Sequence, residues 1–511
     1  MARILKENAL ADTTDIDAVW EYAAFAKNQH DFKDAERFYL IALNSSKDNL
    51  SRQAAFQNSL GILHCNLHDY AKAEEYYLKA LENYTQLFNQ NPDAYRADLA
   101  DTQNNLGLLY YDLHDYAKAE EYMLKALENR TQLFSLNPDA YRAGLAMTQN
   151  NLGNLYKNLH DYAKAEEYYL KALENKTQLF TQNPDAYRAD LAGTQNNLGY
   201  LYKDLHDYAK AEEFYLKALE NKTQLFTQNP DAYRASLAMT QNNLGLLYDD
   251  LHDYAKSEEY YLKALENRTQ LFRQNPDAYR ANLAMTQYNL GLLYKNLHDY
   301  AKSEEYYLKA LENKTLLFAQ NPDTYRVDLV NIQNKLGLLY CYIPDFKKAE
   351  EYLFQALENY TQLFSQNPER YRYDMAIAQH NLGYIYSKIQ NYSKAEEYLR
   401  MALENKTVLY TQNPDAYHVS LANSYNELAY VYAHTQDYAK ALETIDRAIA
   451  LMPEKADYYD SKGEILLMKG DEQEAVKMWQ KVLEVDPDFL QKYEGGTDFY
   501  KQLKERGLIS D

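Results

Sequence analysis

The sequence contains very little cysteine. Only two of its 511 residues are cysteines, Cys65 and Cys341, and they lie far apart in the chain. Small extracellular domains are usually held by several disulfides, and structural zinc sites usually need a cluster of cysteines and histidines. Two isolated thiols argue against both arrangements and favour a reducing compartment, so we expect a cytoplasmic protein.

Long apolar runs are also missing. No stretch of about 18 consecutive apolar residues is found, and the first residues, MARILKENALADTTD, lack the apolar core of a secretory signal peptide. We therefore expect a soluble protein that does not associate with membranes.

Basic residues are outnumbered by acidic ones, 54 against 75, so the formal net charge is −21. A polyanion is repelled by nucleic acid and by anionic lipid, so neither is expected as a partner. The acidic residues are spread along the chain. Residues 139–184 contain five acidic and five basic side chains, which indicates a mixed, solvated helix surface.

Catalytic motifs are missing as well. The chain has no G-x-x-x-x-G-K-[ST] phosphate loop, no H-E-x-x-H zinc motif and no serine nucleophile elbow. Adjacent glutamates such as Glu166 and Glu167 are predicted to lie on a solvated helix face, without the cleft that would perturb a catalytic pKa. We expect no enzyme activity, no cofactor and no metal site.

What the sequence has instead is repetition. Residues 150–173, NNLGNLYKNLHDYAKAEEYYLKAL, return as NNLGYLYKDLHDYAKAEEFYLKAL at residues 196–219. The glycine of the recurring Leu-Gly pair repeats every 46 residues, with alanine at the ninth place and shorter units around Ala23 and Gly463. The series is Gly61, Gly107, Gly153, Gly199, Gly245, Gly291, Gly337, Gly383 and Ala429. This period predicts an array of eleven stacked units.

Each unit is predicted to be an antiparallel pair of helices. Apolar residues recur at helical spacing in the first half, as at Leu191, Leu198 and Tyr202, and again over a second helix of about twenty residues. A single pair cannot bury both apolar stripes alone, so neighbouring units must stack on one another.

The helix ends are marked by constant residues. Only Leu-His-Asp separates the two helices, and Asp161 is expected to cap the second one. Its neighbour His160 recurs once per unit, but helices packed about 8–10 Å apart would keep successive imidazoles from sharing a zinc ion. We therefore expect His160 to serve as a turn residue with an unusual backbone conformation. At the start of the next unit Asn183 can cap and Pro184 suits the first helical turn.

These residues follow a known pattern. The order L-G-x-x-Y and then A, Y and A, as in Leu152, Gly153, Tyr156, Ala165, Tyr169 and Ala172, resembles the tetratricopeptide repeat (TPR). The resemblance covers residues 15–488 and implies an all-α fold, a right-handed α-solenoid superhelix of about eleven antiparallel helix-turn-helix units. The period exceeds the ordinary repeat of 34 residues by about 12, which resembles the extended repeats of kinesin light chain and related bacterial TPR proteins.

Departures from the family pattern are regular. Gln149 stands in the place of an early aromatic residue, His160 in that of a turn glycine and Thr177 in that of a closing proline. The expected division of the chain is an N-terminal tail at 1–14, an atypical first TPR at 15–46, a second at 47–92, seven 46-residue units at 93–414, a tenth at 415–452, an ordinary 34-residue unit at 453–488 and a C-terminal capping helix at 489–511.

Substitutions between units include three positions on one face of the first helix. They lie six residues before the glycine of the Leu-Gly pair, one residue after it and four residues after it. Successive positions are therefore seven and three residues apart, and these spacings place all three on the same face of a helix. In the TPR family this face lines a concave groove and carries ligand specificity. Neutral drift is the alternative, but it explains less well the apolar residues at positions open to water. The candidates are Met147, Asn154, Lys157, Tyr200, Lys203, Met239, Leu246, Met285, Leu292, Tyr384 and Tyr430.

A pair of asparagines recurs between these variable positions. Its second member, at Asn151, Asn197, Asn243 and Asn289, is similar to the asparagine ladder in the TPR domain of O-linked N-acetylglucosamine transferase. That similarity implies hydrogen bonds to the backbone of an extended peptide. The alternative is that each amide bonds within its own or the adjacent repeat.

Taken together, these features predict a non-catalytic scaffold or adaptor that binds an extended peptide or a helix of a partner protein in the concave groove. A peptide-responsive regulator, whose superhelix changes pitch on binding, is the alternative, although residues 1–14 and 489–511 are short for an output domain. Self-association through the ends of the array is left open.

Overall fold

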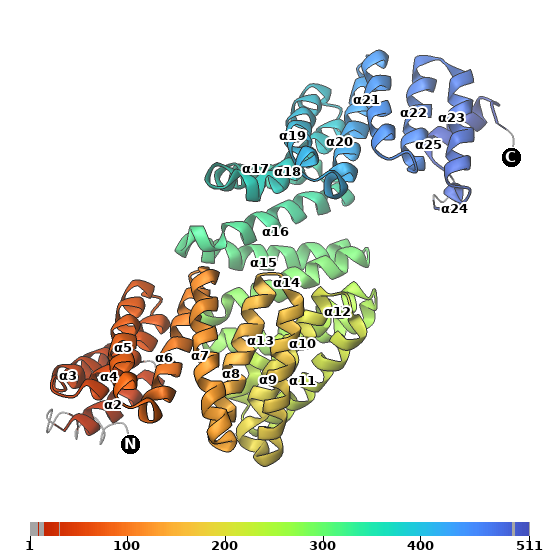
Figure 1. Ribbon diagram of the computed structural model, residues 1–511. Coiled ribbons are helices and arrows are strands. Elements are labelled where there is room, and N and C mark those ends of the chain that lie inside the picture. Colours follow the sequence, from red (N-terminus) through yellow and green to blue (C-terminus); the bar gives the residue numbers. More distant parts are fainter. Residues whose placement is uncertain (1–8, 10–14, 30, 493–495, 510–511) are drawn as a thin grey trace. The chain divides into compact units, whose positions relative to one another are not determined.

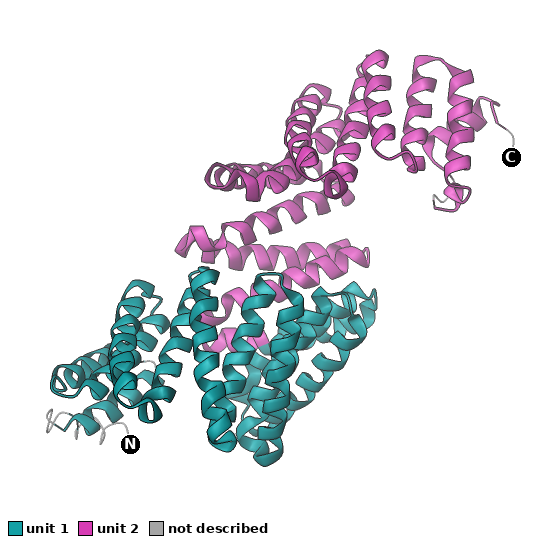
Figure 2. Ribbon diagram, in the orientation of Figure 1, with its two compact units in different colours: residues 1–267 teal, residues 268–511 magenta. Residues whose placement is uncertain are grey.

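The computed structural model describes residues 9, 15–29, 31–492 and 496–509. Every regular element in this part of the chain is a helix (Figure 1). Apart from Ala9, the expected N-terminal tail lies outside the described residues. The chain divides into two compact units, Met1–Asn267 and Arg268–Asp511, and the boundary falls within one long helix (Figure 2).

Consecutive helices are paired through short turns in both units, which confirms the expected all-α fold of helix-turn-helix repeats. The pairs of the first unit are α2 (Ile16–Asn28) with α3 (Phe32–Asn44), α4 (Leu50–Asn66) with α5 (Tyr70–Gln90), α6 (Pro92–Asp112) with α7 (Tyr116–Leu136), α8 (Pro138–Asn158) with α9 (Tyr162–Gln182), α10 (Pro184–Asp204) with α11 (Tyr208–Gln228), and α12 (Pro230–Asp250) with α13 (Tyr254–Gln274), in which the boundary lies.

The second unit continues the pattern and ends in shorter helices. Its pairs are α14 (Pro276–Asn296) with α15 (Tyr300–Gln320), α16 (Pro322–Tyr342) with α17 (Phe346–Gln366), α18 (Pro368–Lys388) with α19 (Tyr392–Gln412), α20 (Pro414–His434) with α21 (Tyr438–Leu451), and α22 (Ala456–Lys469) with α23 (Glu472–Val485), followed by α24 (Phe489–Lys492) and α25 (Asp498–Glu505).

Helix ends are formed by the residues expected from the sequence. Asp161 Oδ1 accepts a hydrogen bond from the backbone N–H of Lys164 at 3.2 Å, and Asn183 Oδ1 accepts one from Ala186 at 3.2 Å. His160 has φ 58°, a left-handed conformation that is uncommon outside glycine. The predicted caps and the predicted role of the histidine are confirmed.

The recurring glycine permits close packing of the two helices in a repeat. A β-carbon added to Gly153 would lie 2.5 Å from the ring of Tyr169, which is fully buried. A β-carbon added to Gly107 would meet the side chain of Met123, and one added to Gly337 would meet that of Leu353. A side chain here would push the helices apart and open the core that they share.

The C-terminal segment corrects one expectation. Instead of a single capping helix over residues 489–511, two short helices form, α24 and α25. Gly496 has φ 79°, and the Thr497 hydroxyl caps α25 by accepting from the backbone N–H of Tyr500 at 3.2 Å. A left-handed glycine followed by a cap residue starts a new helix. Phe499 and Leu503 of α25 are buried in a cluster that includes Trp479.

Candidate binding face

The first helices of neighbouring repeats contact one another in both units, as α8 contacts α10 and α16 contacts α18. We call the surface formed by the variable positions of these helices the first-helix face. In the first unit Met147, Tyr200 and Met239 lie on it with 44, 38 and 42% of their surface exposed. Apolar side chains of this size are therefore available to a ligand at intervals along the array.

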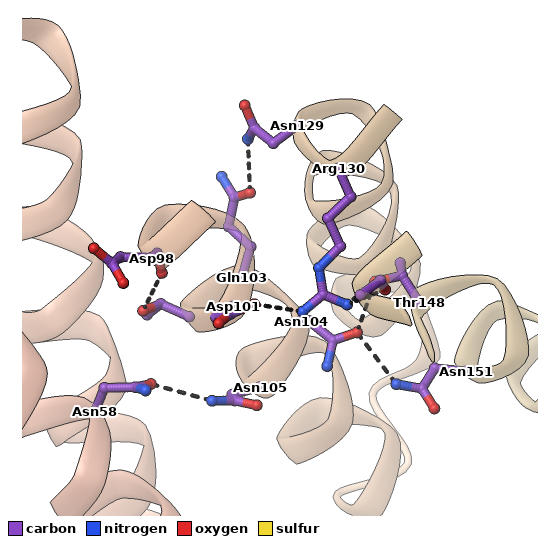
Figure 3. A network of polar contacts seen from close by, with 12 residues as sticks. Asn58, Asp98, Asp101, Gln103, Asn104, Asn105, Asn129, Arg130, Thr148 and Asn151 are labelled. Carbon is purple, nitrogen blue, oxygen red and sulfur yellow. Dashed lines mark hydrogen bonds and ion pairs between the residues drawn. The ribbon is translucent and has the colours of Figure 1, made fainter. Parts of the chain in front are cut away.

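The asparagine row lies between these side chains and is bonded within the protein. Asn151 Nδ2 donates to Asn104 Oδ1 of the preceding repeat at 3.2 Å (Figure 3), and Asn243 Nδ2 donates to Asn196 Oδ1 at 3.3 Å. Asn197 makes the corresponding contact with Asn150 at 3.4 Å. In the second unit Asn289 is buried. Of the two alternatives that the sequence leaves open, these contacts favour bonding between adjacent repeats.

Beneath the row lies a polar network that the sequence analysis missed. Arg130 is buried, and its Nη1 donates to Thr148 Oγ1 of the next repeat at 2.5 Å, while Thr148 donates to Asn104 Oδ1 at 3.2 Å (Figure 3). Arg130 Nη2 also forms an ion pair with Asp101 at 2.6 Å. We call this arrangement of a cation, a hydroxyl and an asparagine the junction network, because it joins two repeats.

Lysine takes the place of arginine at the next two junctions. Lys176 Nζ donates to Thr194 at 2.8 Å, and Lys222 Nζ donates to Thr240 at 2.7 Å. Burial lowers the pKa of both lysines to about 8. The prediction that the basic side chains of residues 139–184 lie on a solvated surface is therefore wrong for Lys176. The sequence contained a signal for this burial, because the basic residue lies on the apolar stripe of its helix. Arg130, for example, continues the stripe of Met123 and Ala126.

Several variable polar positions also contact neighbouring repeats. Lys157 Nζ lies 4.1 Å from the centre of the Tyr200 ring, and burial lowers the pKa of that lysine. Asn154 Oδ1 accepts hydrogen bonds from the Tyr169 hydroxyl at 2.6 Å and from Asn197 at 3.3 Å. Lys203 forms an ion pair with Asp250 at 3.1 Å. These side chains hold the first-helix face in shape. The candidate Leu246 is half-buried.

The candidates of the second unit form a separate set. Met285 is exposed, whereas Leu292, Tyr384 and Tyr430 are half-buried. Lys388 Nζ lies 5.1 Å from the centre of the Tyr384 ring and 5.6 Å from that of Tyr430. An ammonium group close to two aromatic faces is a favourable cation–π arrangement. None of the three tyrosine candidates, Tyr200 included, is enclosed in the core.

The paired glutamates have separate structural partners. Glu166 accepts a hydrogen bond from the Tyr202 hydroxyl of the next repeat at 2.6 Å, and Glu167 forms an ion pair with Lys171 at 2.5 Å. No group of three or more histidine, cysteine, aspartate or glutamate side chains among the described residues is arranged to hold a metal ion. Within the same residues, no helix combines the length and apolar character needed to cross a membrane.

Comparison with known proteins places these repeats in one family. The family model described as "Tetratricopeptide repeat" matches residues 52–132, 98–178, 144–224, 190–270, 236–315, 282–362, 328–407 and 420–488. No curated protein sequence matches the chain.

Solved structures with a similar fold include BtubC (BKLC) from P. vanneervenii, which is 26% identical, covers 47% of this chain and 89% of its own, and has a TM-score of 0.40. RapI in its apo form is 16% identical over 59% of this chain and 98% of its own, with a TM-score of 0.43. PilF from Pseudomonas aeruginosa is 16% identical, covers 53% of this chain and 99% of its own, and has a TM-score of 0.37. Because the family model matches most of the sequence, the chain belongs to the tetratricopeptide repeat family, whose repeats typically mediate contacts between proteins and are generally non-catalytic.

Proposed function

We propose that the protein is a non-catalytic scaffold or adaptor, and that its first-helix face binds an extended segment or a helix of a partner protein. The observation that supports this most is the recurrence of exposed Met147, Tyr200 and Met239 at positions that vary between otherwise constant repeats. Large apolar anchors surrounded by polar groups are the usual source of binding energy at protein interfaces.

The polar surroundings of these anchors support the same proposal. The amide groups of Asn151 and Asn197 and the ammonium group of Lys157 already have partners within the array. A ligand therefore meets a preorganised surface, so that little side-chain entropy is lost on binding. On this proposal specificity comes from the apolar anchors, and the asparagine row has mainly a structural role.

We place the scaffold in the cytoplasm, because Cys65 and Cys341 are both free thiols. The net charge of −21 makes a protein a better partner than nucleic acid or an anionic membrane.

The proposal is tested by affinity capture from the source cell with three baits of equal helicity. The first is the native protein, and the second carries Met147→Ser, Tyr200→Ala and Met239→Ser. The third is a matched control with Leu170, Leu216 and Leu262 changed to Ser, because these leucines of the second helices are exposed to a similar degree.

A partner held by the native protein and the control, but lost by the first-helix variant, would support the proposal. The expected loss is at least about thirtyfold in affinity, since anchor residues contribute about 2 kcal/mol or more. Loss of the partner by the control alone would assign binding to the second helices and contradict the proposal.

A further inference from the structure

The junction that follows Lys314, in the second unit, lacks the junction network. Lys314 occupies the position of Arg130, Lys176 and Lys222, but the next repeat has Ile332 where the others have threonine, so no hydroxyl is available. Lys314 Nζ instead forms an ion pair with Asp328 Oδ2 at 2.6 Å, with only 9% of the lysine side chain exposed. Tyr288 also replaces the first asparagine of the pair.

A cavity of about 280 Å³ opens at this junction, between α14, α15 and α16. Its walls include the aromatic side chains of Tyr288 and Tyr325, the aliphatic side chain of Ile332 and the candidate residue Met285. Asn331 lies on its rim at a position where earlier repeats have methionine, as at Met239. A shorter side chain at the rim and the loss of the junction network thus coincide with the cavity.

Size and charge restrict what this cavity can hold. Its volume is just below the range of about 300–1,000 Å³ that is usual for small-molecule sites, which suits a single large side chain. Its two charged groups, Lys314 and Asp328, neutralise each other. A charged occupant would have to break that pair, so a neutral one is favoured. The rings of Tyr288 and Tyr325 can pack against another ring in offset or edge-to-face geometry.

We propose that the cavity is an anchor pocket for a neutral aromatic side chain of the partner protein. This inference rests on the proposed function, because it names the chemistry by which the first-helix face recognises a bound segment. The pocket lies beside Met285 and within one unit, so it sets the register of the segment on the repeats that follow.

The pocket is tested with indole as the probe, using the full-length protein labelled with ¹³C at the methionine methyl groups. Met147, Met239 and Met285 occupy the same position in their repeats, but only Met285 lines this cavity. Titration with indole is expected to give a saturable shift of the Met285 methyl signal and no saturable shift of the other two. Equal responses of all three methyl groups, or no response of Met285, would overturn the proposal.

Two variants built from the chain's own repeats provide the controls. Tyr288→Asn with Ile332→Thr restores the residues of an ordinary junction, and Asn331→Met restores the methionine at the rim. The same residues occur at equivalent positions elsewhere, although Asn331→Met also removes the acceptor of the Tyr360 hydroxyl at 2.9 Å, so equal helicity is checked first. Both variants should weaken indole binding at least tenfold. Unchanged binding in both variants would contradict the assignment of the site.

Cyclohexanol tests the aromatic preference. It is expected to bind roughly tenfold more weakly than indole, since aromatic pairs gain energy beyond the area that they bury. Equal affinity would overturn the aromatic assignment. Because neither titration needs a partner protein, failure of the pocket is distinguished from failure of the scaffold proposal, which the capture experiment tests separately.

Discussion

Lys222 Nζ donates a hydrogen bond to Thr240 Oγ1 at 2.7 Å, across the boundary between two repeats. Both residues are buried, and Thr240 in turn donates to Asn196 Oδ1 at 2.9 Å. In a repeat array much of the stability comes from the interfaces between neighbours. A single hydroxyl that serves both a buried ammonium and a buried amide is therefore a sensitive point of each interface.

Thr240→Ile is expected to lower the free energy of unfolding by about 1–3 kcal/mol, because it leaves the Lys222 ammonium without its acceptor. Adding Ser236→Asp should recover most of the loss, since Asp328 takes this role at the Lys314 junction. Urea unfolding of the single and double variants measures both effects, with the exposed Thr223→Ile as the control. If Thr240→Ile and Thr223→Ile behave alike, the hydroxyl does not stabilise the junction.

Substitutions at His160 should report the left-handed turn. His160→Gly is expected to stabilise the turn by up to about 1 kcal/mol, and His160→Val to destabilise it by about 1–2 kcal/mol, because a β-branched side chain resists positive φ. The last ordinary repeat already has glycine here, since Gly470 has φ 90°. Hydrogen exchange of the Asp161 amide, which donates to Tyr156 at 2.9 Å, provides the measurement. Equal exchange rates in both variants would contradict the expectation.

The contact between α22 and α25 should weaken as pH rises. Burial raises the pKa of Asp460 to about 7, with Glu464 and Asp498 adding to the shift, and the carboxylate accepts from the Thr497 hydroxyl at 2.8 Å. The unfolded value is near 4, so the folded state binds the extra proton between about pH 4 and 7. Its contribution to stability is complete below that window and is lost as pH rises through 7.

Hydrogen exchange of residues 498–505, corrected for the intrinsic pH dependence, measures this effect. Asp460→Asn is expected to remove most of the difference in protection between pH 5 and pH 8, which we estimate at about 2–4 kcal/mol. Asp488→Asn, a change at an exposed residue near the same end, should leave the difference intact. A pH dependence that persists in Asp460→Asn would exclude this carboxyl group as its source.

Local features of the fold were predictable from the sequence, because their signals lie close together along the chain. The caps at Asp161 and Asn183 and the turn at His160 each involve residues within a few positions of one another. The two-helix unit follows from apolar spacing alone. The shape of the C-terminal end was less predictable, since Gly496 and Thr497 interrupt what reads as one amphipathic segment.

The interior of the binding face was harder to predict, because its contacts join residues far apart in sequence. Arg130 meets Thr148 at a separation of 18 residues, and Thr148 meets Asn104 at a separation of 44. A lysine or arginine on a helix is usually solvated, so composition alone assigns it to the surface. The role of the asparagine row was ambiguous for another reason, because a side-chain amide can form hydrogen bonds with an adjacent repeat as well as with the backbone of a bound peptide.

The bonded asparagines of the row have a consequence for how such a chain changes its length in evolution. Asn104 with Asn151 and Asn196 with Asn243 are each 47 residues apart, one more than the period. Excision of residues 184–229 would therefore bring Asn243 opposite Asn150 and Thr240 opposite Lys176, restoring the contacts of an ordinary junction. Duplication or loss of whole repeats by unequal recombination leaves every such junction paired, whereas an insertion of any other size breaks one. The junction of Lys314 must be inherited as a set, because Ile332 stands where the preceding copy has Thr286, and the ion pair of Lys314 with Asp328 takes the place of the missing hydroxyl contact.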